Sequence, residues 1–264
     1  MFQKKIGNSV FEISHKRMDR PDKSVYFNHI HDYCEILLFI CGDADFNIDG
    51  QAFHPSPYDL IFIPPATYHC LLPMSQLPYE NYVIDFKPDI IESRYYEKLF
   101  SSPMMINVKE DGEILDLFSR LDRYESRYDD EDFNVCTFAL IKELMVCCAY
   151  SKGDAHSSKI ASPTHIEGII NFISKNIEAP IDVGIISKHM HLSESYVQNL
   201  FSQNMHIGLK KYIMQKKIYA AHGDILDGVS PSRAGEKYGF GDYSSFYRLY
   251  KKTFGVSPRE NAKS

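Results

Sequence analysis

Four side chains near the amino terminus have the types and spacing of a site for a metal ion or a polar ligand. His29, His31 and Glu35 are separated by even steps in HIHDYCEILLFICG, so on a β-strand all three share one face. His69 follows in IFIPPATYHC. Three imidazoles and a carboxylate suit iron, manganese, nickel or zinc, with positions left open for a substrate. The alternative is that these groups hydrogen-bond one another and the nearby backbone.

A second group of polar side chains lies on helices predicted at residues 195–203 and 243–253. The outward positions of these helices are Ser195, Gln198, Asn199, Tyr243, Ser244, Tyr247 and Arg248. Gln and Asn can pair with adenine through two hydrogen bonds, and Arg can pair with guanine, each pair giving about 1–3 kcal/mol of discrimination. Lysines nearby are suited to phosphate contacts, which position a protein without reading sequence: Lys210, Lys211, Lys216, Lys251 and Lys252. For any single residue, a solvated helix face is the alternative.

The segment around the histidines reads as an all-β unit. From residue 25 to about residue 86, short β-branched and aromatic runs such as EILLFI, DLIFIPP and NYVIDF are broken by Gly, Pro, Asn and Asp. No helical crossover pattern separates these runs, which favours a small sandwich or barrel over a parallel sheet. We assign residues 1–90 to this unit.

The middle of the chain changes period. Between residues 91 and 150, apolar residues recur at spacings of three and four, which predicts amphipathic helices separated by the charged stretch 127–134. These helices either pair two chains or cover their own barrel. Residues 151–163 lack periodicity and are rich in Ser, Ala and Lys, so they are predicted to link two domains.

The carboxyl-terminal residues 164–264 contain two helix-turn-helix patterns. Helices are predicted at 164–176, 183–189, 195–203, 209–226, 231–238 and 243–253. Ser193 is suited to cap the third helix, and Val197, Leu200 and Phe201 give it an inward apolar face. The helix at 209–226 joins the two patterns.

These residues resemble the AraC/XylS family of bacterial transcription regulators. The match covers residues 181–259 and is densest in YGFGDYSSFYRLYKKTFGVSPREN, with Gly239-Phe240, Lys251-Lys252 and Phe254-Gly255 at the family's spacing. The resemblance implies a double helix-turn-helix domain that binds double-stranded DNA. Two units on one helix are expected to enter successive major grooves roughly 34 Å apart.

Four residues depart from the family pattern. His206 stands where the family has the Gly of the turn after the first recognition helix, and Ala234-Gly235 replaces a common Ile-Ala pair. Gly223 and Gly235 fall within predicted helices, where each costs about 1 kcal/mol relative to Ala. We therefore expect a second unit less stable than is usual, while the effect of His206 on DNA binding stays open.

The histidine segment is also similar to the metal-binding motifs of the cupins, which are small β-barrels. Gly42 follows Glu35 at the cupin distance, but Lys23 replaces the opening Gly of the first motif. The second motif is poorly met, since Pro64 and His69 remain but Tyr58, Ala66 and Pro73 replace its two glycines and its Asn. We therefore expect a cupin-like barrel without metal or other cofactor.

The preferred role of this barrel is an effector pocket for a sugar or another small molecule. Aromatic walls and a few convergent polar groups suit such a ligand, and the predicted lining is His29, His31, Tyr33, Glu35, Phe39, Phe62, Tyr68 and His69. An ordinary packed core without a ligand is the alternative, because Phe and Tyr fill barrels routinely.

Charge divides the chain in the same place as the motifs. The net charge of −6 is the sum of −10 over residues 1–160, with 16 basic and 26 acidic residues, and +4 over residues 161–264, with 13 and 9. A basic unit attached to an acidic one fits a DNA-binding domain on a sensor. The six cysteines form no Cys-x-x-Cys pair, so we interpret them as reduced thiols.

Together these patterns predict an α+β two-domain protein with a cupin-like β-barrel and flanking helices, followed by an all-α double helix-turn-helix domain. Its expected function is a sequence-specific transcription regulator, an activator, that responds to a small effector. Expected partners are DNA, RNA polymerase and a second copy of the chain. No membrane segment or signal peptide is apparent, so a cytoplasmic location is expected. The alternative is a metal-dependent cupin enzyme, an oxygenase or isomerase, with a DNA-binding appendage.

Overall fold

The computed structural model describes residues 1–6, 10–21, 28–101, 104–151, 159–160 and 164–262. The chain divides into two compact units, Met1–Ala161 and Ser162–Ser264. The boundary falls within the predicted linker 151–163. Lys23 and most of that linker lie outside the described residues.

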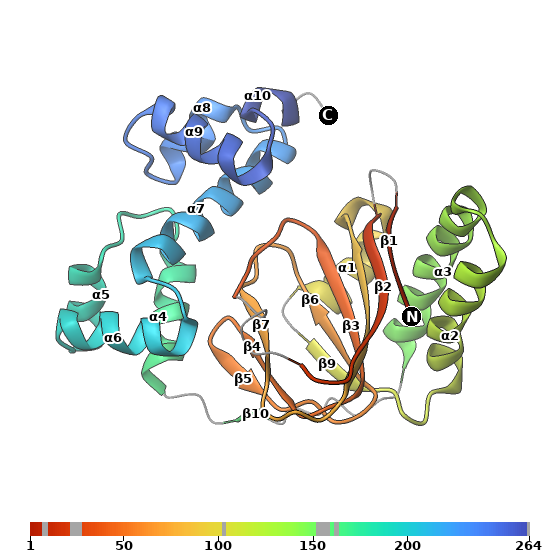
Figure 1. Ribbon diagram of the computed structural model, residues 1–264. Coiled ribbons are helices and arrows are strands. Elements are labelled where there is room, and N and C mark those ends of the chain that lie inside the picture. Colours follow the sequence, from red (N-terminus) through yellow and green to blue (C-terminus); the bar gives the residue numbers. More distant parts are fainter. Residues whose placement is uncertain (7–9, 22–27, 102–103, 152–158, 161–163, 263–264) are drawn as a thin grey trace. The chain divides into compact units, whose positions relative to one another are not determined.

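The amino-terminal unit is built on two antiparallel sheets (Figure 1). The larger sheet has the order β1-β2-β8-β3-β6-β9. Its strands are β1 (Phe2–Ile6), β2 (Val10–Met18), β3 (Cys34–Cys41), β6 (Asp59–Ile63), β8 (Tyr79–Phe86) and β9 (Met104–Asn107).

The smaller sheet has the order β10-β5-β4-β7. Its strands are β4 (Ala44–Ile48), β5 (Gln51–Phe53), β7 (His69–Pro73) and β10 (Lys159–Ile160). Strand β10 lies within the predicted linker and pairs with β5, so residues 159–160 belong to the amino-terminal unit. Along the described residues the two ladders stay separate, so the expected barrel is an open, cupin-like pair of sheets.

Strand alternation divides the unit into two cores. Leu37, Phe39 and Ile61 face the smaller sheet and pack with Phe46 and Leu71. The intervening residues of β3 and β6, together with two residues of β8, face the other way, toward the helices: Ile36, Leu38, Leu60, Phe62, Tyr82 and Ile84. This places one layer of side chains between the sheets and another under the helices.

Helices cover the outer face of the larger sheet (Figure 1). They are η2 (Pro88–Ile90), α1 (Ser93–Phe100), α2 (Gly112–Arg127) and α3 (Asp130–Tyr150). The charged stretch 127–134 contains the break between α2 and α3, as predicted, at residues 128–129. Its later residues begin α3, because Asp129 accepts a hydrogen bond from the Asp132 amide and three acidic residues occupy the first turn. By length and composition α3 could cross a membrane, but eight of its side chains are buried, as in a core helix.

The carboxyl-terminal unit is all helical in its described residues and matches the predicted order. Its helices are α4 (Thr164–Lys175), α5 (Val183–Met190), α6 (Glu194–Met205), α7 (Leu209–Leu226), α8 (Pro231–Lys237), α9 (Tyr243–Phe254) and α10 (Pro258–Asn261). Helices α5 and α6 form the first helix-turn-helix unit, and α8 and α9 form the second. Helix α7 joins them, so the α+β two-domain expectation is confirmed.

Candidate functional site

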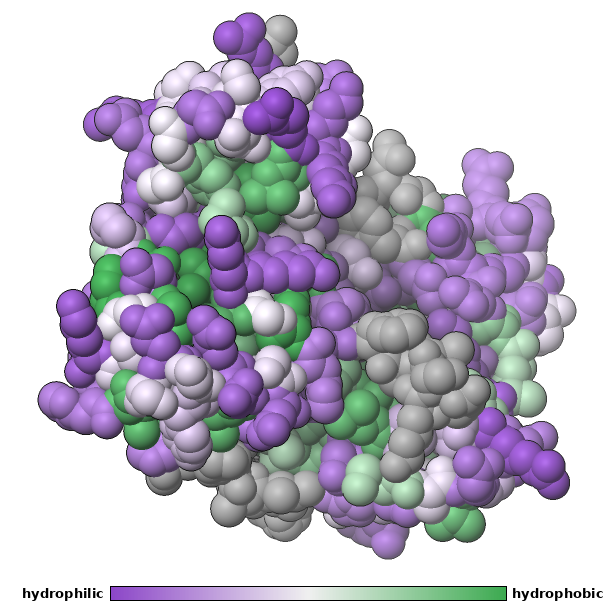
Figure 2. All heavy atoms as spheres, turned by 60° about the vertical axis from the view of Figure 1, so that its left-hand side comes forward, coloured by the Kyte–Doolittle hydropathy of each residue, from purple (hydrophilic) through white to green (hydrophobic). Residues whose placement is uncertain are grey.

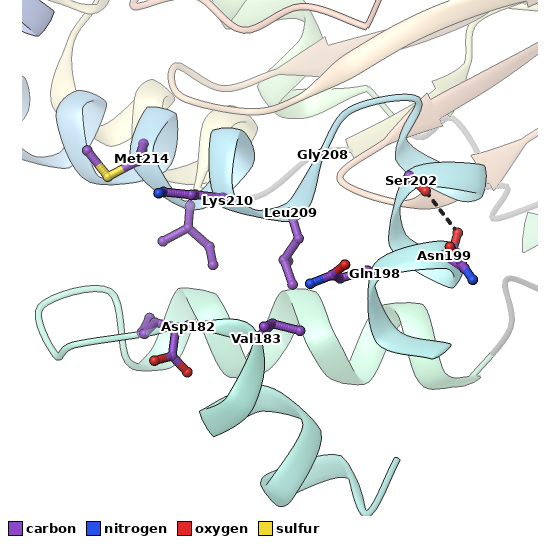
Figure 3. A pocket seen from close by; sticks show the side chains of 11 residues that line it. Asp182, Val183, Gln198, Asn199, Ser202, Gly208, Leu209, Lys210 and Met214 are labelled. Atoms are coloured by element: carbon purple, nitrogen blue, oxygen red, sulfur yellow. Dashed lines mark hydrogen bonds between the residues drawn. The ribbon is translucent and has the colours of Figure 1, made fainter. Parts of the chain in front are cut away.

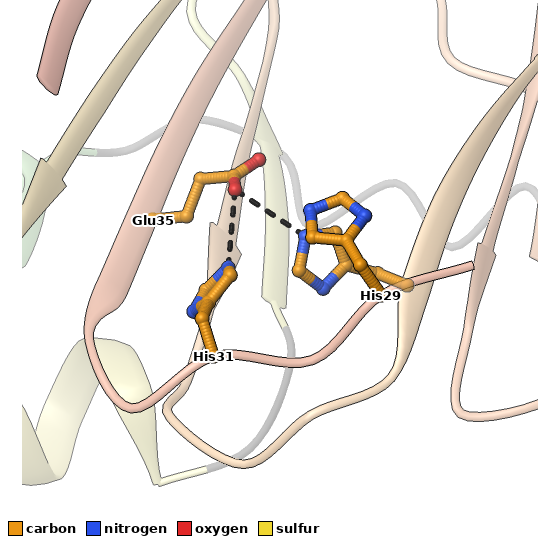
Figure 4. A group of neighbouring side chains, drawn as sticks. His29, His31 and Glu35 are labelled. Atoms are coloured by element: carbon orange, nitrogen blue, oxygen red, sulfur yellow. Dashed lines mark hydrogen bonds and ion pairs between the residues drawn. The ribbon is translucent and has the colours of Figure 1, made fainter. Parts of the chain in front are cut away.

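The predicted histidine cluster is assembled at the edge where the two sheets approach each other. His29 and His69 form an antiparallel bridge through two backbone hydrogen bonds of 3.0 Å. One donor atom from each of His29, His31, Glu35 and His69 lies within 4.8 Å of the others. Glu35 Oε2 is 3.2 Å from His31 Nε2 and 3.3 Å from His69 Nε2 (Figure 4).

Backbone carbonyls orient two of these rings. The Nδ1 atoms of His31 and His69 lie 2.9 Å from the Tyr33 carbonyl oxygen and 3.0 Å from that of Thr67. Donation by Nδ1 leaves Nε2 facing Glu35, as second-shell carbonyls do for metal-ligating histidines. Spacings of 3.2 and 3.3 Å match the edge of a tetrahedron with metal–ligand bonds of about 2.0 Å. The donor set therefore fits a divalent transition metal, and it fits equally a cluster of ion pairs.

Glu35 and His69 shift each other's pKa in opposite directions. Burial alone would raise the pKa of Glu35, but His69 and His31 hold it well below its usual value. Burial would lower the pKa of His69, and the Glu35 carboxylate outweighs that effect and raises it. The carboxylate is thus ionised, with an imidazole proton facing it.

Beside the cluster, a cavity of about 500 Å³ opens between the sheets, which is within the usual size for a small-molecule site. Four of the predicted effector residues line it: His29, Tyr33, Glu35 and His69. His31 stacks on Tyr33 with ring centroids 3.9 Å apart and contacts Glu35, without being part of the lining.

Three predicted aromatic residues are not part of the cavity lining. Phe62 faces the helices and packs edge-on against Phe100, with ring centroids 5.5 Å apart. Phe39 lies in the core between the sheets, against Tyr79. Tyr68 is fully buried next to the bridge. The alternation of β6 directs Phe62 away from the cavity, because Ile61 and Ile63 take the inward positions.

Sequence reasoning missed the polar residues of β2 and β8. Glu12, Lys16, Asn81 and Asp85 all line the cavity. Burial, together with the neighbouring carboxylates of Glu35 and Glu12, raises the pKa of Asp85 to about 9. The alternation in NYVIDF, which puts Asn81 and Asp85 on one face, was the available signal.

In the carboxyl-terminal unit, α6 presents the first predicted set of base-reading residues. Ser195, Gln198 and Asn199 are exposed, and Val197 and Phe201 are fully buried beneath them. The predicted cap is confirmed, because the Ser193 side chain accepts a hydrogen bond from the Tyr196 amide.

A hollow of about 630 Å³ lies beside this helix. Gln198, Leu209 and Val183 point toward one another across it, and Asn199, Ser202 and Lys210 stand at its margin (Figure 3). Hydrophilic side chains cover most of the surface in Figure 2, with hydrophobic patches between them. Exposed apolar residues in this unit include Ile185, Tyr196 and Met214.

Helix α9 presents the second set. Tyr243, Ser244 and Arg248 are exposed, and Tyr247 is half-buried. Asp242 caps the helix by accepting from the Ser245 amide at 2.8 Å.

The predicted phosphate-contacting lysines are found at helix ends and along α7. Lys210 and Lys211 are exposed in the first turn of α7, and Lys251 and Lys252 are exposed in the last turn of α9. Lys216 is half-buried, with Nζ 6.0 Å from the centre of the Tyr212 ring.

One lysine of α7 faces inward and was not predicted. Lys217 is 5% exposed, and its Nζ donates to the Ala179 carbonyl at 2.7 Å and to the Tyr238 carbonyl at 3.0 Å. Ala179 precedes the first helix-turn-helix unit, and Tyr238 ends the first helix of the second. Lys217 therefore connects the two units through α7.

Comparison with known proteins gives a match in each unit. A family described as an AraC-like ligand binding domain matches residues 17–124, and a helix-turn-helix domain family matches residues 186–264. A probable transcriptional regulator, LumQ of Photobacterium leiognathi, is 23% identical over 92% of this chain and 94% of its own length. The transcriptional activator RhaR of Cronobacter sakazakii is 19% identical, covering 91% and 88%. The crystal structure of ToxT from Vibrio cholerae O395 aligns with 95% of this chain and 96% of its own at 14% identity, with a TM-score of 0.40.

Proposed function

Since the chain belongs to the AraC family of DNA-binding transcription regulators, we propose that a ligand in the amino-terminal cavity controls how helices α6 and α9 bind DNA. The chain is a regulator that responds to a ligand. The observation that carries the proposal is the pair of capped helices with polar outer faces, each packed on α7 through aromatic contacts, Phe201 of α6 on Tyr212 and Phe254 of α9 on His222.

The two helices have different readers for base edges. Gln198 and Asn199 on α6 offer amides suited to adenine, and Ser195 offers a hydroxyl. Arg248 on α9 offers a guanidinium suited to guanine. Tyr243, Ser244 and Tyr247 complete the second set. A monomer then recognises two unlike blocks of sequence about one helical turn apart.

Basic side chains beside these helices position the protein on the duplex. Lys210, Lys211, Lys216, Lys251 and Lys252 contact phosphates, an interaction that weakens as salt rises.

The effector binds in the cavity between the sheets. His29, Tyr33, Glu35 and His69 line it, and the mixture of polar groups with Leu37, Phe46 and Leu71 suits a small polar molecule such as a sugar. His31 orients Glu35 from behind. Phe39, Phe62 and Tyr68 form the surrounding core.

The remaining partners follow from the same assignment. One similar protein is named a transcriptional activator, which supports activation through RNA polymerase. Helix α3 exposes Val135 and Val146, which supports a homodimer through this helix. A cytoplasmic location, with access to DNA, completes the proposal.

The second candidate is a metal-dependent enzyme, favoured by the convergence of His29, His31, Glu35 and His69. Names of the similar proteins describe regulators, and we therefore propose that the chain has no catalytic activity. Metal analysis of protein purified without added metal separates the two, because an enzyme of this kind retains close to one ion per chain.

Selection from a random duplex DNA library at near-physiological salt tests the leading proposal. Enrichment of two short blocks about one helical turn apart is expected. Retained DNA with no shared sequence, at a salt concentration where binding persists, would contradict the role of α6 and α9 as readers.

A further inference from the structure

Three carboxyl side chains form a row across the wall of the cavity. Glu12 of β2 pairs directly with Asp85 of β8, and Asp85 pairs directly with Glu35 of β3. Directly opposed residues of antiparallel strands lie about 5 Å apart on one face, and all three side chains line the cavity. Like charges placed opposite each other destabilise a sheet, so three ionised carboxylates in this row would cost stability. Burial and the neighbouring carboxylates instead hold Asp85 protonated in the free protein, with a pKa of about 9.

Two of these three groups already have a cation. Lys16 Nζ is 3.0 Å from Glu12 Oε1, and Glu35 is paired with imidazoles. Asp85 is 8% exposed, and within the described chain its Oδ1 has no hydrogen-bond partner. Among the described residues, Asp85 is therefore the one carboxyl of the row with no ion pair, and an ammonium placed beside it would favour its ionised form.

A second buried acceptor lies further along the same strand. Asn81 is 6% exposed and lines the cavity, and no group of the described residues hydrogen-bonds its Oδ1. Four residues of strand put Asn81 and Asp85 roughly 13 Å apart at the backbone. Val83 and Leu37 supply an apolar wall between them.

We propose that the effector is a small organic cation, with an ammonium group against Asp85 and a second hydrogen-bond donor against Asn81, joined by a short apolar chain over Val83 and Leu37. The inference rests on the proposed ligand control and narrows its chemistry. A neutral polyol can hydrogen-bond to the same acceptors, but it places no positive charge beside Asp85. Burial of an ammonium against a carboxylate gives a charge-assisted hydrogen bond, the stronger of the two pairings.

The test uses the full chain, treated with a chelator, and straight-chain diaminoalkanes of four to six carbons with the matched diols as neutral controls. Thermal unfolding and titration calorimetry measure binding. We expect a diamine to raise the Tm where its diol does not. Asp85→Asn should weaken diamine binding by about tenfold or more, while Asp116→Asn, an exposed carboxyl paired with Arg123 on α2, leaves it unchanged.

Asp85→Asn also reports on folding. Since the Asp85 carboxyl is protonated at neutral pH, with a pKa of about 9, a neutral Asn replaces it closely, and the Tm without ligand should stay close to that of the wild type. The proposal is overturned if a diol binds as tightly as its diamine, if no diamine binds, or if Asp85→Asn binds diamine like the wild type. Stabilisation by zinc or nickel alone, with no response to diamines, also overturns it and assigns the cation site to the imidazoles.

The same preparation separates this inference from the proposed function. Enriched bipartite DNA from the library selection without any diamine response means that the effector class is wrong and the regulator assignment stands. If a diamine binds at Asp85 but the chain selects no DNA, with or without the diamine, the cation site stands and the regulator assignment is wrong.

Discussion

The two helix-turn-helix units share a capping pattern at the start of their second helices but differ in how those helices end and pack. Ser193 and Asp242 cap α6 and α9 in the same way. Helix α6 then ends on His206 with φ of 50°, and α9 ends on Gly255 with φ of 76°. In the second unit, Gly235 lets α8 approach the ring of Phe246 closely. The first helix-turn-helix unit thus contains a strained backbone position at His206. The second unit needs a residue without a side chain at Gly235, where α8 packs on Phe246.

Removing the Lys217 hydrogen bonds that connect the two helix-turn-helix units should have the largest effect on stability. Lys217→Met keeps the length of the side chain but leaves the Ala179 and Tyr238 carbonyls without their donor, so we expect a loss of about 2–3 kcal/mol in the free energy of unfolding. Lys216→Met, one residue away and half-buried, is the control and should change stability little.

DNA binding by the Lys217→Met variant shows whether Lys217 fixes the distance between the two helix-turn-helix units or only stabilises the fold. Because Lys217 fixes both units on α7, the variant should tolerate operators in which the two blocks are moved apart by one base pair better than the wild type does. An unchanged spacing preference would show that α7 alone sets the distance between the units.

The two recognition helices should differ in the kind of specificity that each provides. Arg248→Ala removes the guanidinium of α9, and we expect discrimination at one base position to fall by about 1–3 kcal/mol. Lys251→Ala should instead weaken binding to all sequences alike and lower the salt dependence by about one. Binding measured on single-base operator variants decides, and equal, uniform losses from both changes would falsify the assignment.

The glycines separate the effect of helix propensity from that of packing. An added Cβ at Gly235 would lie 3.2 Å from Phe246 Cγ, whereas at Gly223 it would meet nothing within 4 Å. Phe246 is fully buried between Phe240 and Tyr250, so it cannot yield readily. Gly223→Ala should stabilise the protein by about 1 kcal/mol, and Gly235→Ala should destabilise it by up to about 1 kcal/mol in chemical denaturation. Stabilisation by both changes would mean that the ring relocates.

That contrast corrects an expectation from the sequence. Both glycines were predicted to weaken the second unit, because helix propensity is a local property that can be assigned without a structure. The close approach of Phe246 to Gly235 depends on the packing of α8 against α9, which no local pattern specifies. Gly235 is therefore a requirement of the packing.

The helices of the carboxyl-terminal unit could be predicted almost residue by residue, because helix caps and apolar spacing depend only on residues close together in the sequence. The helix at 209–226 has the predicted bounds, and Ser193 has its predicted role. The cavity could be predicted only in part. His29, Glu35 and His69 are conspicuous by type, but Glu35 meets Asp85 through a strand pairing across fifty residues of sequence, and register is not a local signal.

The direction of the Phe62 side chain could not be predicted from the sequence either. All five residues of β6 are buried, so alternation of hydrophobicity cannot tell which face meets the helices and which meets the other sheet. Its direction is fixed by the pairing with β3 and by the helices that cover the larger sheet.

The smallest expected effect concerns the end of α6. His206 occupies a left-handed conformation that costs a non-glycine residue about 1–2 kcal/mol, and its amide donates to the Ser202 carbonyl at 3.0 Å. His206→Gly relieves the strain but adds freedom to the unfolded chain, so we expect a net gain of about 0.5 kcal/mol in the free energy of unfolding. Gly255→His, the mirror change in α9, should lose a similar amount. If His206→Gly also weakens DNA binding uniformly without loosening base preference, His206 contacts a phosphate, and its strained position serves binding rather than the fold.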